Sequence, residues 1–442
     1  MKEDLTQGPV IKTMLRFAVP MIFGNLLQQC YNIADTLIVG RFLGAGALAA
    51  VGSAFSLMTF LTSILLGLAM GSGTVFSIRF GQKDQLGLKE GILASFVLLS
   101  IVTALLNTAV FMGLDWIIWI LRTPANLVAM MREYLSVIFI GLAGIFLFNF
   151  FTSLLRSLGN SVVPLLFLAV SAVLNIALDL WFVAGLNRGA AGAAEATVIS
   201  QYVSGIGIAV YTRIKYPELL RRDKKVRFRL SRVKEITGFS ALTCLQQSIM
   251  NLGILMVQGL VNSFGTTIMA AFAAAVKIDA FAYLPVQDFG NAFSIFTAQN
   301  YGAKQTERIK KGIRAALTAS VAFSLMVSFC VFVFAKPLMT LFINAEETAV
   351  IEEGVRYLHI EGAFYFLIGI LFLFYGLYRA LAKPGMSVVL TIASLGIRVA
   401  LAYALSAIPA FGIAGIWWSV PIGWLLADVL GTVYYFVKRK TY

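Results

Sequence analysis

Long apolar stretches alternate with short polar connections along the whole chain. Each stretch has the roughly 20 or more residues that a helix needs to cross the hydrocarbon core of a bilayer. The runs are continuous, whereas strands of a membrane barrel would alternate polar and apolar residues, so helices are expected. The pattern predicts an all-α membrane protein with twelve transmembrane helices, at 13–39, 47–78, 90–114, 131–157, 162–184, 189–214, 234–263, 268–299, 309–335, 354–381, 385–408 and 412–438.

The composition excludes a soluble domain. Hydrophobic residues make up 59% of the 442 residues and charged residues 13%, whereas soluble proteins carry about 25% charged residues. The first apolar run is too long for a signal-peptide core and no small-residue cleavage site follows it, so a retained helix is expected. Cys30, Cys244 and Cys330 lie in different apolar segments without a CxxC pair, which argues against a disulfide framework or a zinc site.

Positive charges gather in alternate connections and so indicate orientation. The middle connection carries ten cations from Arg213 to Lys234, whereas the opposite set of connections holds few cations, among them Arg41, Arg122 and Arg188. Both termini and the middle connection are therefore expected in the cytoplasm. The remaining cations of the cytoplasmic set are Arg79, Lys83, Lys89, Arg156, Lys304, Arg308, Lys310, Lys311, Arg379, Lys383, Lys438, Arg439 and Lys440.

The net charge of +14 has an explanation in the membrane, because anionic headgroups attract cytoplasmic cations. Membrane lipids are thus expected partners. A nucleic-acid partner is not expected, since no stacking platform or nucleic-acid motif accompanies Arg221–Arg229.

The two halves of the chain align with each other. The segment that begins at Arg79 (RFGQKDQ) matches the one that begins at Asn300 (NYGAKQT). Leu155–Leu158 matches Tyr378–Leu381, and Gly189–Gly192 matches Gly412–Gly415, with nearly the same spacing between the members of each pair. These matches predict an N-lobe at 1–214, a basic linker at 215–233 and a C-lobe at 234–442. An even number of helices in each lobe places the pseudo-two-fold axis along the membrane normal, a design typical of transporters.

Polar side chains inside the N-lobe helices predict an ion site. An ionisable residue at the centre of a helix costs about 2.5–3.5 kcal/mol to insert, so it is a functional candidate by default. Asp35, Asp179 and Thr197 lie at depths that agree within a few Å, and Asn175 lies one turn before Asp179 on the same face. Glu195 is about 200° around its helix from Thr197 and is expected to face elsewhere. The set is rich in oxygen, without His or Cys, which suits H⁺, Na⁺ or an organic cation.

The C-lobe differs at these positions. Met256 and Ala402 stand where the repeat would place Asp35 and Asp179, and Arg398 stands in place of Asn175. A possible secondary site comprises Lys277, Asp279, Asp288 and Arg398, with Glu195 of the N-lobe as a further candidate. Structural pairing between acids and bases is the preferred explanation for the four C-lobe charges. The single histidine, His359, is expected to pair with Glu361 at the outer membrane interface.

The chain resembles the multidrug and toxic compound extrusion (MATE) family over nearly its full length. The stretches that carry the resemblance are NIADTLIVG from Asn32, LNIALD from Leu174, GAAEATVISQ from Gly192 and RSLGNSVVP from Arg156. The resemblance implies an antiporter that exports organic cations in exchange for H⁺ or Na⁺. It also implies that Asp35, Asn175, Asp179 and Thr197 bind the coupling ion, with Na⁺ held only transiently and with no resident metal or cofactor. Some sodium-coupled relatives have further carboxylates in helices 7 and 10, whereas helix 7 here offers Gln246 and Gln247.

Two other classes of function remain as alternatives. A flippase for a lipid-linked saccharide or a lipid would share this architecture and would need a basic cavity, for which Lys277 and Arg398 are the candidates. An intramembrane enzyme is not expected, because no HExxH, GxGD or GxSG motif is present. The preferred hypothesis is a monomeric multi-pass antiporter for amphipathic organic cations in a bacterial or archaeal plasma membrane.

Overall fold

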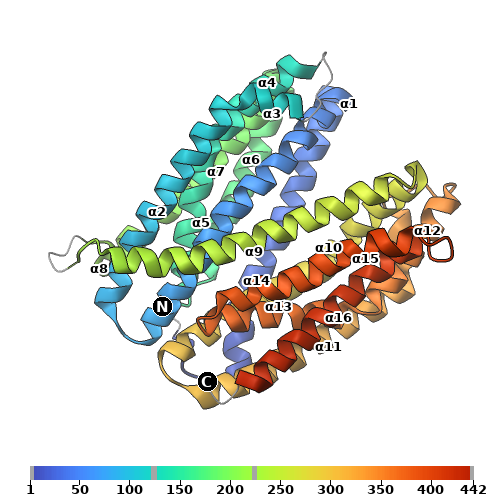
Figure 1. The fold of residues 1–442 in the computed structure, drawn as a ribbon. Helices are drawn as coiled ribbons and strands as arrows, with labels where there is room; N and C mark the ends of the chain where they lie inside the picture. Colours follow the sequence, from blue (N-terminus) through green and yellow to red (C-terminus); the bar gives the residue numbers. More distant parts are fainter. Residues whose placement is uncertain (1–3, 121–126, 222–225, 439–442) are drawn as a thin grey trace. The chain divides into compact units, whose positions relative to one another are not determined.

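The computed structural model describes residues 4–120, 127–221 and 226–438, and within these ranges the chain forms helices and no strand (Figure 1). Several cations counted above lie outside the described residues: Arg122, Arg222, Lys224, Lys225, Arg439 and Lys440. The elements are α1 (Val10–Gly81), α2 (Gln85–Met112), α3 (Leu114–Ile120), α4 (Val128–Ile138), η2 (Phe139–Gly141), α5 (Leu142–Ser157), α6 (Val162–Asp179), η3 (Leu180–Gly185), α7 (Gly189–Lys215), α8 (Pro217–Leu220), α9 (Leu230–Asn262), α10 (Thr266–Gly302), α11 (Thr306–Thr340), α12 (Thr348–Gly362), α13 (Tyr365–Ala380), α14 (Pro384–Thr391), η4 (Ile392–Gly396), α15 (Ile397–Ser406) and α16 (Ile413–Lys438).

The prediction of twelve transmembrane helices is confirmed. Among the described residues, eleven helices are long and apolar enough to cross a membrane, and the pair α12 and α13, bent by 51°, makes twelve when it is counted as one span. Helix α1 contains two of the spans, Val10–Gly44 and Leu57–Gly81, on either side of a break at Gly44. The break at Gly44 falls between the first two predicted spans, 13–39 and 47–78.

The described chain divides into two compact units. Unit 1 contains residues 23–244, and unit 2 contains residues 5–22 and 245–442. Each unit therefore includes the beginning of a long helix whose remainder belongs to the other unit: residues 230–244 of α9 in unit 1, and residues 10–22 of α1 in unit 2.

The internal repeat is visible in the backbone. Left-handed φ angles recur at the same spacing that aligns the two halves of the sequence. Since few L-residues adopt this conformation, the recurrence confirms that the two halves are structural repeats. The pairs are Gly44 (81°) with Gly265 (98°), Lys83 (57°) with Lys304 (57°), Gly159 (85°) with Ala382 (59°), and Gly189 (62°) with Gly412 (49°).

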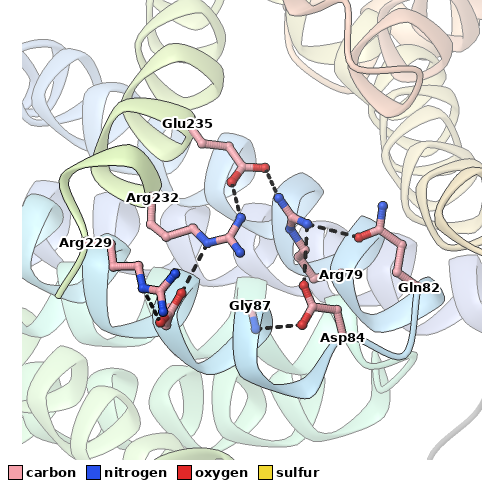
Figure 2. A network of polar contacts seen from close by, with 8 residues as sticks. Arg79, Gln82, Asp84, Gly87, Arg229, Arg232 and Glu235 are labelled. Atoms are coloured by element: carbon pink, nitrogen blue, oxygen red, sulfur yellow. Dashed lines mark hydrogen bonds and ion pairs between the residues drawn. The ribbon is translucent and has the colours of Figure 1, made fainter. Parts of the chain in front are cut away.

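Ion pairs hold the start of α9 in unit 1. Figure 2 shows Arg79 of α1 bonded to Glu235 of α9, with Nη2 and Oε1 2.6 Å apart. Arg232 binds the same Glu235 at 3.1 Å and reaches Glu90 of α2 at 3.3 Å. Arg229 meets Glu90 at 3.0 Å, and the Glu90 side chain is only 1% exposed. The basic linker is therefore tied to α1 and α2 by a shared network rather than by one isolated pair.

Small residues bring α9 unusually close to α1 just beyond this network. A Cβ atom added at Gly67 or Gly71 would lie 2.5 Å from the Cα of Cys244 or Ser240, respectively, so only glycine fits there. Ser72 and Ser240 share a hydrogen bond of 3.0 Å, and Ser240 also donates to the carbonyl oxygen of Leu68. Such small-residue contacts are typical of helix packing in membranes.

The segment that begins at Asn300, the repeat counterpart of the one at Arg79, makes similar contacts within unit 2. Asn300, the repeat counterpart of Arg79, donates to the carbonyl oxygen of Leu5 at 3.3 Å. Arg308 donates to the carbonyl oxygens of Gln7 and Gly8 at 2.6 and 2.7 Å. In unit 1 the end of α1 binds the start of α9, and in unit 2 the end of α10 and the start of α11 bind the residues just before α1. The same place in each repeat therefore binds the beginning of the other repeat.

Candidate functional site

Helix α6 positions the first two residues of the predicted ion site. Asn175 and Asp179 lie one turn apart, and their exposed fractions are 2% and 0%. Asp179 is the last α-helical residue, and the chain continues directly into the π-helical segment η3. Such π segments are frequent at functional sites because they change the direction of the following side chains.

Asp35 and Thr197 complete the group in unit 1. The carboxyl groups of Asp35 and Asp179 are close enough to interact electrostatically. Asn175 Nδ2 donates to Thr197 Oγ1 at 3.3 Å, which joins α6 to α7. The structure thus places Asp35 near Asp179, and Thr197 against Asn175, one turn before Asp179.

Several oxygen atoms of this group lack a donor. Within the described chain, no donor reaches either carboxylate oxygen of Asp179, Oδ1 of Asp35 or Oδ1 of Asn175, although all four atoms are buried. Buried acceptors without a donor are rare in proteins, because desolvation is then not compensated. A bound proton or Na⁺ would provide the missing interaction, and the oxygen-only donor set fits such an ion.

Two tyrosines beside the carboxylates were not identified from the sequence. Tyr31 lies one turn before Asp35 on α1, and Tyr134 of α4 is 7% exposed. Both hydroxyl groups interact electrostatically with Asp35 and Asp179. The spacing of Tyr31 and Asp35 was a usable signal. The position of Tyr134 was not, because it depends on the packing of α4 against other helices.

Glu195 lies apart from this group. Its carboxylate binds Arg188 at 2.8 Å near the start of α7. The side chain thus has a cation of its own, in keeping with a position on another face of the helix from Thr197.

A second cluster of acids lies in unit 2. Asp279 of α10 and Glu361 of α12 are 6% and 4% exposed, and their carboxyl groups interact. Asp279 accepts hydrogen bonds from the hydroxyl groups of Tyr357, at 2.6 Å, and Tyr365. Arg398 contributes a positive charge to both acids. In contrast to Asp179, Asp279 therefore has neutral donors on both carboxylate oxygens.

One of the predicted pairings of the C-lobe charges is wrong, and the other is indirect. Arg398 interacts electrostatically with Asp279, but among the described residues no ion pair joins Asp279 to Lys277 or Arg398. The ammonium group of Lys277 lies 5.8 Å from the ring of Phe342. The predicted pair of His359 and Glu361 is wrong, because His359 stacks on Phe332 whereas Glu361 is buried beside Asp279. The error has one physical cause: positions along a helix do not show which side faces its neighbours.

Comparison with known proteins gives the family. The MatE family model matches residues 20–181 and again 241–404, so it covers each half of the chain in turn. The chain belongs to the MatE family. Both halves of this MatE protein thus correspond to the same model, in agreement with the internal repeat.

The relatives of this MatE protein include named transporters. The "Probable multidrug resistance protein YpnP" of Bacillus subtilis (strain 168) is 30% identical over 440 residues, which are 98% of this chain and 96% of the relative. A protein named "FAD transporter" from Shewanella oneidensis is 24% identical over 452 residues, 99% of this chain and 96% of the relative. A solved structure described as the outward-facing conformation of a multidrug resistance MATE family transporter superposes with a TM-score of 0.90 at 24% identity, over 100% of this chain and 98% of that one. The protein is therefore a membrane transporter of the multidrug efflux family and not an enzyme.

Proposed function

We propose that this MatE protein exports amphipathic organic cations in exchange for H⁺ or Na⁺, and that Asp35, Asn175, Asp179 and Thr197 bind the coupling ion. One observation carries the proposal: Asp179 is fully buried, with the half-buried Asp35 near it, and no donor from the described residues reaches either oxygen of Asp179. Charged groups inside a membrane protein are costly and typically mark ion pathways.

Neutralisation of the two acids drives the proposed cycle. An ion that enters from outside binds Asp35 and Asp179, removes their negative charge and weakens the site's attraction for a cationic cargo. The cargo leaves, the protein changes conformation, and the ion is released inside. Coupling requires that the ion bind the two conformations with different affinities, because equal affinities would shift no population.

The charge of the unit 1 site supports a cationic cargo. Family membership alone does not identify the cargo as a cation, since one relative is named FAD transporter. The flippase alternative would need a basic cavity for phosphate groups. Lys277 lies over Phe342 and Arg398 lies near two acids, so neither side chain supports that alternative.

Orientation and location are part of the proposal. The cations of the alternate connections support cytoplasmic termini, and the bacterial relative supports a plasma membrane location. We also propose that one chain is the working unit, because the proposed ion-binding residues Asp35, Asn175, Asp179 and Thr197 all belong to one compact unit of the chain.

Transport in proteoliposomes tests the function directly. Purified protein should expel or accumulate a fluorescent organic cation when either a pH gradient or a Na⁺ gradient is imposed, and collapse of that gradient should stop the flux. A gradient of the ineffective ion is the internal control. Transport of an anionic dye but of no cationic dye would contradict the cargo assignment, and flux without any ion gradient would contradict antiport.

A further inference from the structure

One buried acid of unit 2 belongs to neither cluster described above. Asp428 of α16 is 6% exposed, and neither of its carboxylate oxygens has a hydrogen-bond partner among the described residues. It lies well before the end of α16 at Lys438, about 15 Å along the helix, and therefore well inside the span. The adjacent Ala427 and the preceding turn's Trp424 are buried as well.

One buried tyrosine interacts with this carboxyl group over more than hydrogen-bonding distance. Tyr375 of α13 is 4% exposed and interacts electrostatically with Asp428 without donating a hydrogen bond to it. The hydroxyl group of Tyr375 instead shares a hydrogen bond of 3.1 Å with Ser394 of η4, and Ser394 donates to the carbonyl oxygen of Thr391 at 3.2 Å. Neither hydroxyl group therefore compensates the burial of Asp428.

The charged groups on the helices around α16 form no ion pair with Asp428 among the described residues. Arg379 of α13 donates to Asn291 at 3.0 Å, and Glu353 of α12 accepts from Trp417 at 2.6 Å, about three turns of α16 away from Asp428. Arg398 of α15 contacts α16 at Gly423: the Cβ atom of Arg398 lies 3.2 Å from where a Cβ added to Gly423 would be. Segments α14 and η4 carry no charged residue, and Tyr378 of α13 donates to the carbonyl oxygen of Gly431. In the described chain, no cation forms an ion pair with Asp428.

The site has no counterpart in the other repeat. At the spacing that pairs Gly412 with Gly189, Asp428 corresponds to Gly205 and Tyr375 to Thr152, so unit 1 has no acid at this place. Gly205 packs against the carbonyl oxygen of Gly144, 2.7 Å from the position of an added Cβ, so the fold itself does not call for an acid here.

A buried, unpaired carboxylate cannot remain charged at low cost in a membrane interior, since desolvation of an ion requires compensation. We propose that Asp428 is a proton-binding site of the transport cycle, separate from the carboxyl pair of unit 1. A proton fits better than a metal ion, because the hydroxyl oxygens do not converge on the carboxylate within hydrogen-bonding distance. The inference rests on the proposed function only for the statement that this proton is moved during transport.

Infrared spectroscopy of the purified protein tests proton binding without transport. Wild-type protein stepped from acid to alkaline pH should lose a carboxylic-acid band that D428N lacks and that D35N and D179N retain. D115N removes an exposed acid (76% exposed) and should leave this band unchanged. If D428N folds poorly, Y375F should shift the frequency of the band. A spectrum that is the same in wild type, D428N and Y375F overturns the proposal.

Coupling is measured separately in proteoliposomes. The number of protons moved per organic cation, obtained from the membrane potential at which net flux stops, should fall by one in D428N while cation binding stays at the wild-type affinity. An unchanged ratio overturns the assignment of Asp428 to the cycle. Loss of all gradient-driven flux in the wild type would contradict the proposed function instead, and the infrared band would then still decide whether Asp428 binds a proton.

Discussion

At the scale of single residues, the buried acids of this protein fall into two kinds. Asp279 accepts hydrogen bonds from two tyrosine hydroxyls, whereas Asp179 and Asp428 have no donor for either oxygen among the described residues. A carboxylate with its donors in place contributes to stability, and one without them is available to an ion. The presence or absence of hydrogen-bond donors to the carboxylate, more than its burial, therefore distinguishes structural acids from candidate coupling residues.

Removal of one tyrosine hydroxyl should reveal this structural role. Y357F deletes the donor at 2.6 Å from Asp279 Oδ2, and Tyr357 is only 2% exposed, so no water replaces it. We expect a loss of about 1–3 kcal/mol in the free energy of unfolding, measured as a lower midpoint of thermal unfolding in detergent. Y403F is the matched control, since Tyr403 is 49% exposed and should leave the midpoint unchanged. Equal midpoints for wild type and Y357F would contradict this role.

The sequence could identify the four polar residues of unit 1, because their depths along the helices follow from residue counts. It could not identify Tyr134 or the contact between Glu361 and Asp279, which depend on how helices rotate against one another. Asp428 could have been identified from the sequence by the same criterion as Asp35, because each is a lone acid in an apolar run. Only the structure shows that its carboxylate lacks donors.

At the scale of elements, the long helices α1 and α9 are divided between the units. Helix length was predictable because the hydrocarbon core fixes the number of apolar residues. The division near positions 22 and 244 was not predictable, since it depends on packing at Gly67 and Gly71 and on ion pairs. The bend of 51° between α12 and α13 was missed for a similar reason, because the apolar pattern runs through it.

The ion-pair network should be needed to hold the start of α9. E90Q removes a charge that is 1% exposed and that pairs with Arg229 and Arg232. We expect a loss of about 1–3 kcal/mol in the free energy of unfolding and faster amide hydrogen exchange across residues 230–244. E307Q changes an exposed pair with Lys310 and should alter neither quantity, as exposed ion pairs contribute little. Unchanged exchange in E90Q would show that the glycine contacts alone hold the segment.

At the scale of the whole molecule, the repeated sequence made the architecture predictable. The spacing that aligns the two halves of the sequence reappears in the backbone angles and in the double match to the MatE model. The functional difference between the two repeats was harder to predict, because it depends on single differences between equivalent positions, such as Asp35 and Met256. The central claim follows from this asymmetry: the acids of unit 1 couple the ion to the cargo.

The most direct test is drug efflux from everted membrane vesicles, normalised to the amount of folded protein. D35N and D179N keep the side-chain size and remove the charge, so each should abolish gradient-driven efflux. N175A and T197A should weaken coupling less, because neither removes a charge, and E195Q should be milder still, since Glu195 is paired with Arg188. Near wild-type efflux by both aspartate variants would contradict the account and would direct attention to the acids of α10.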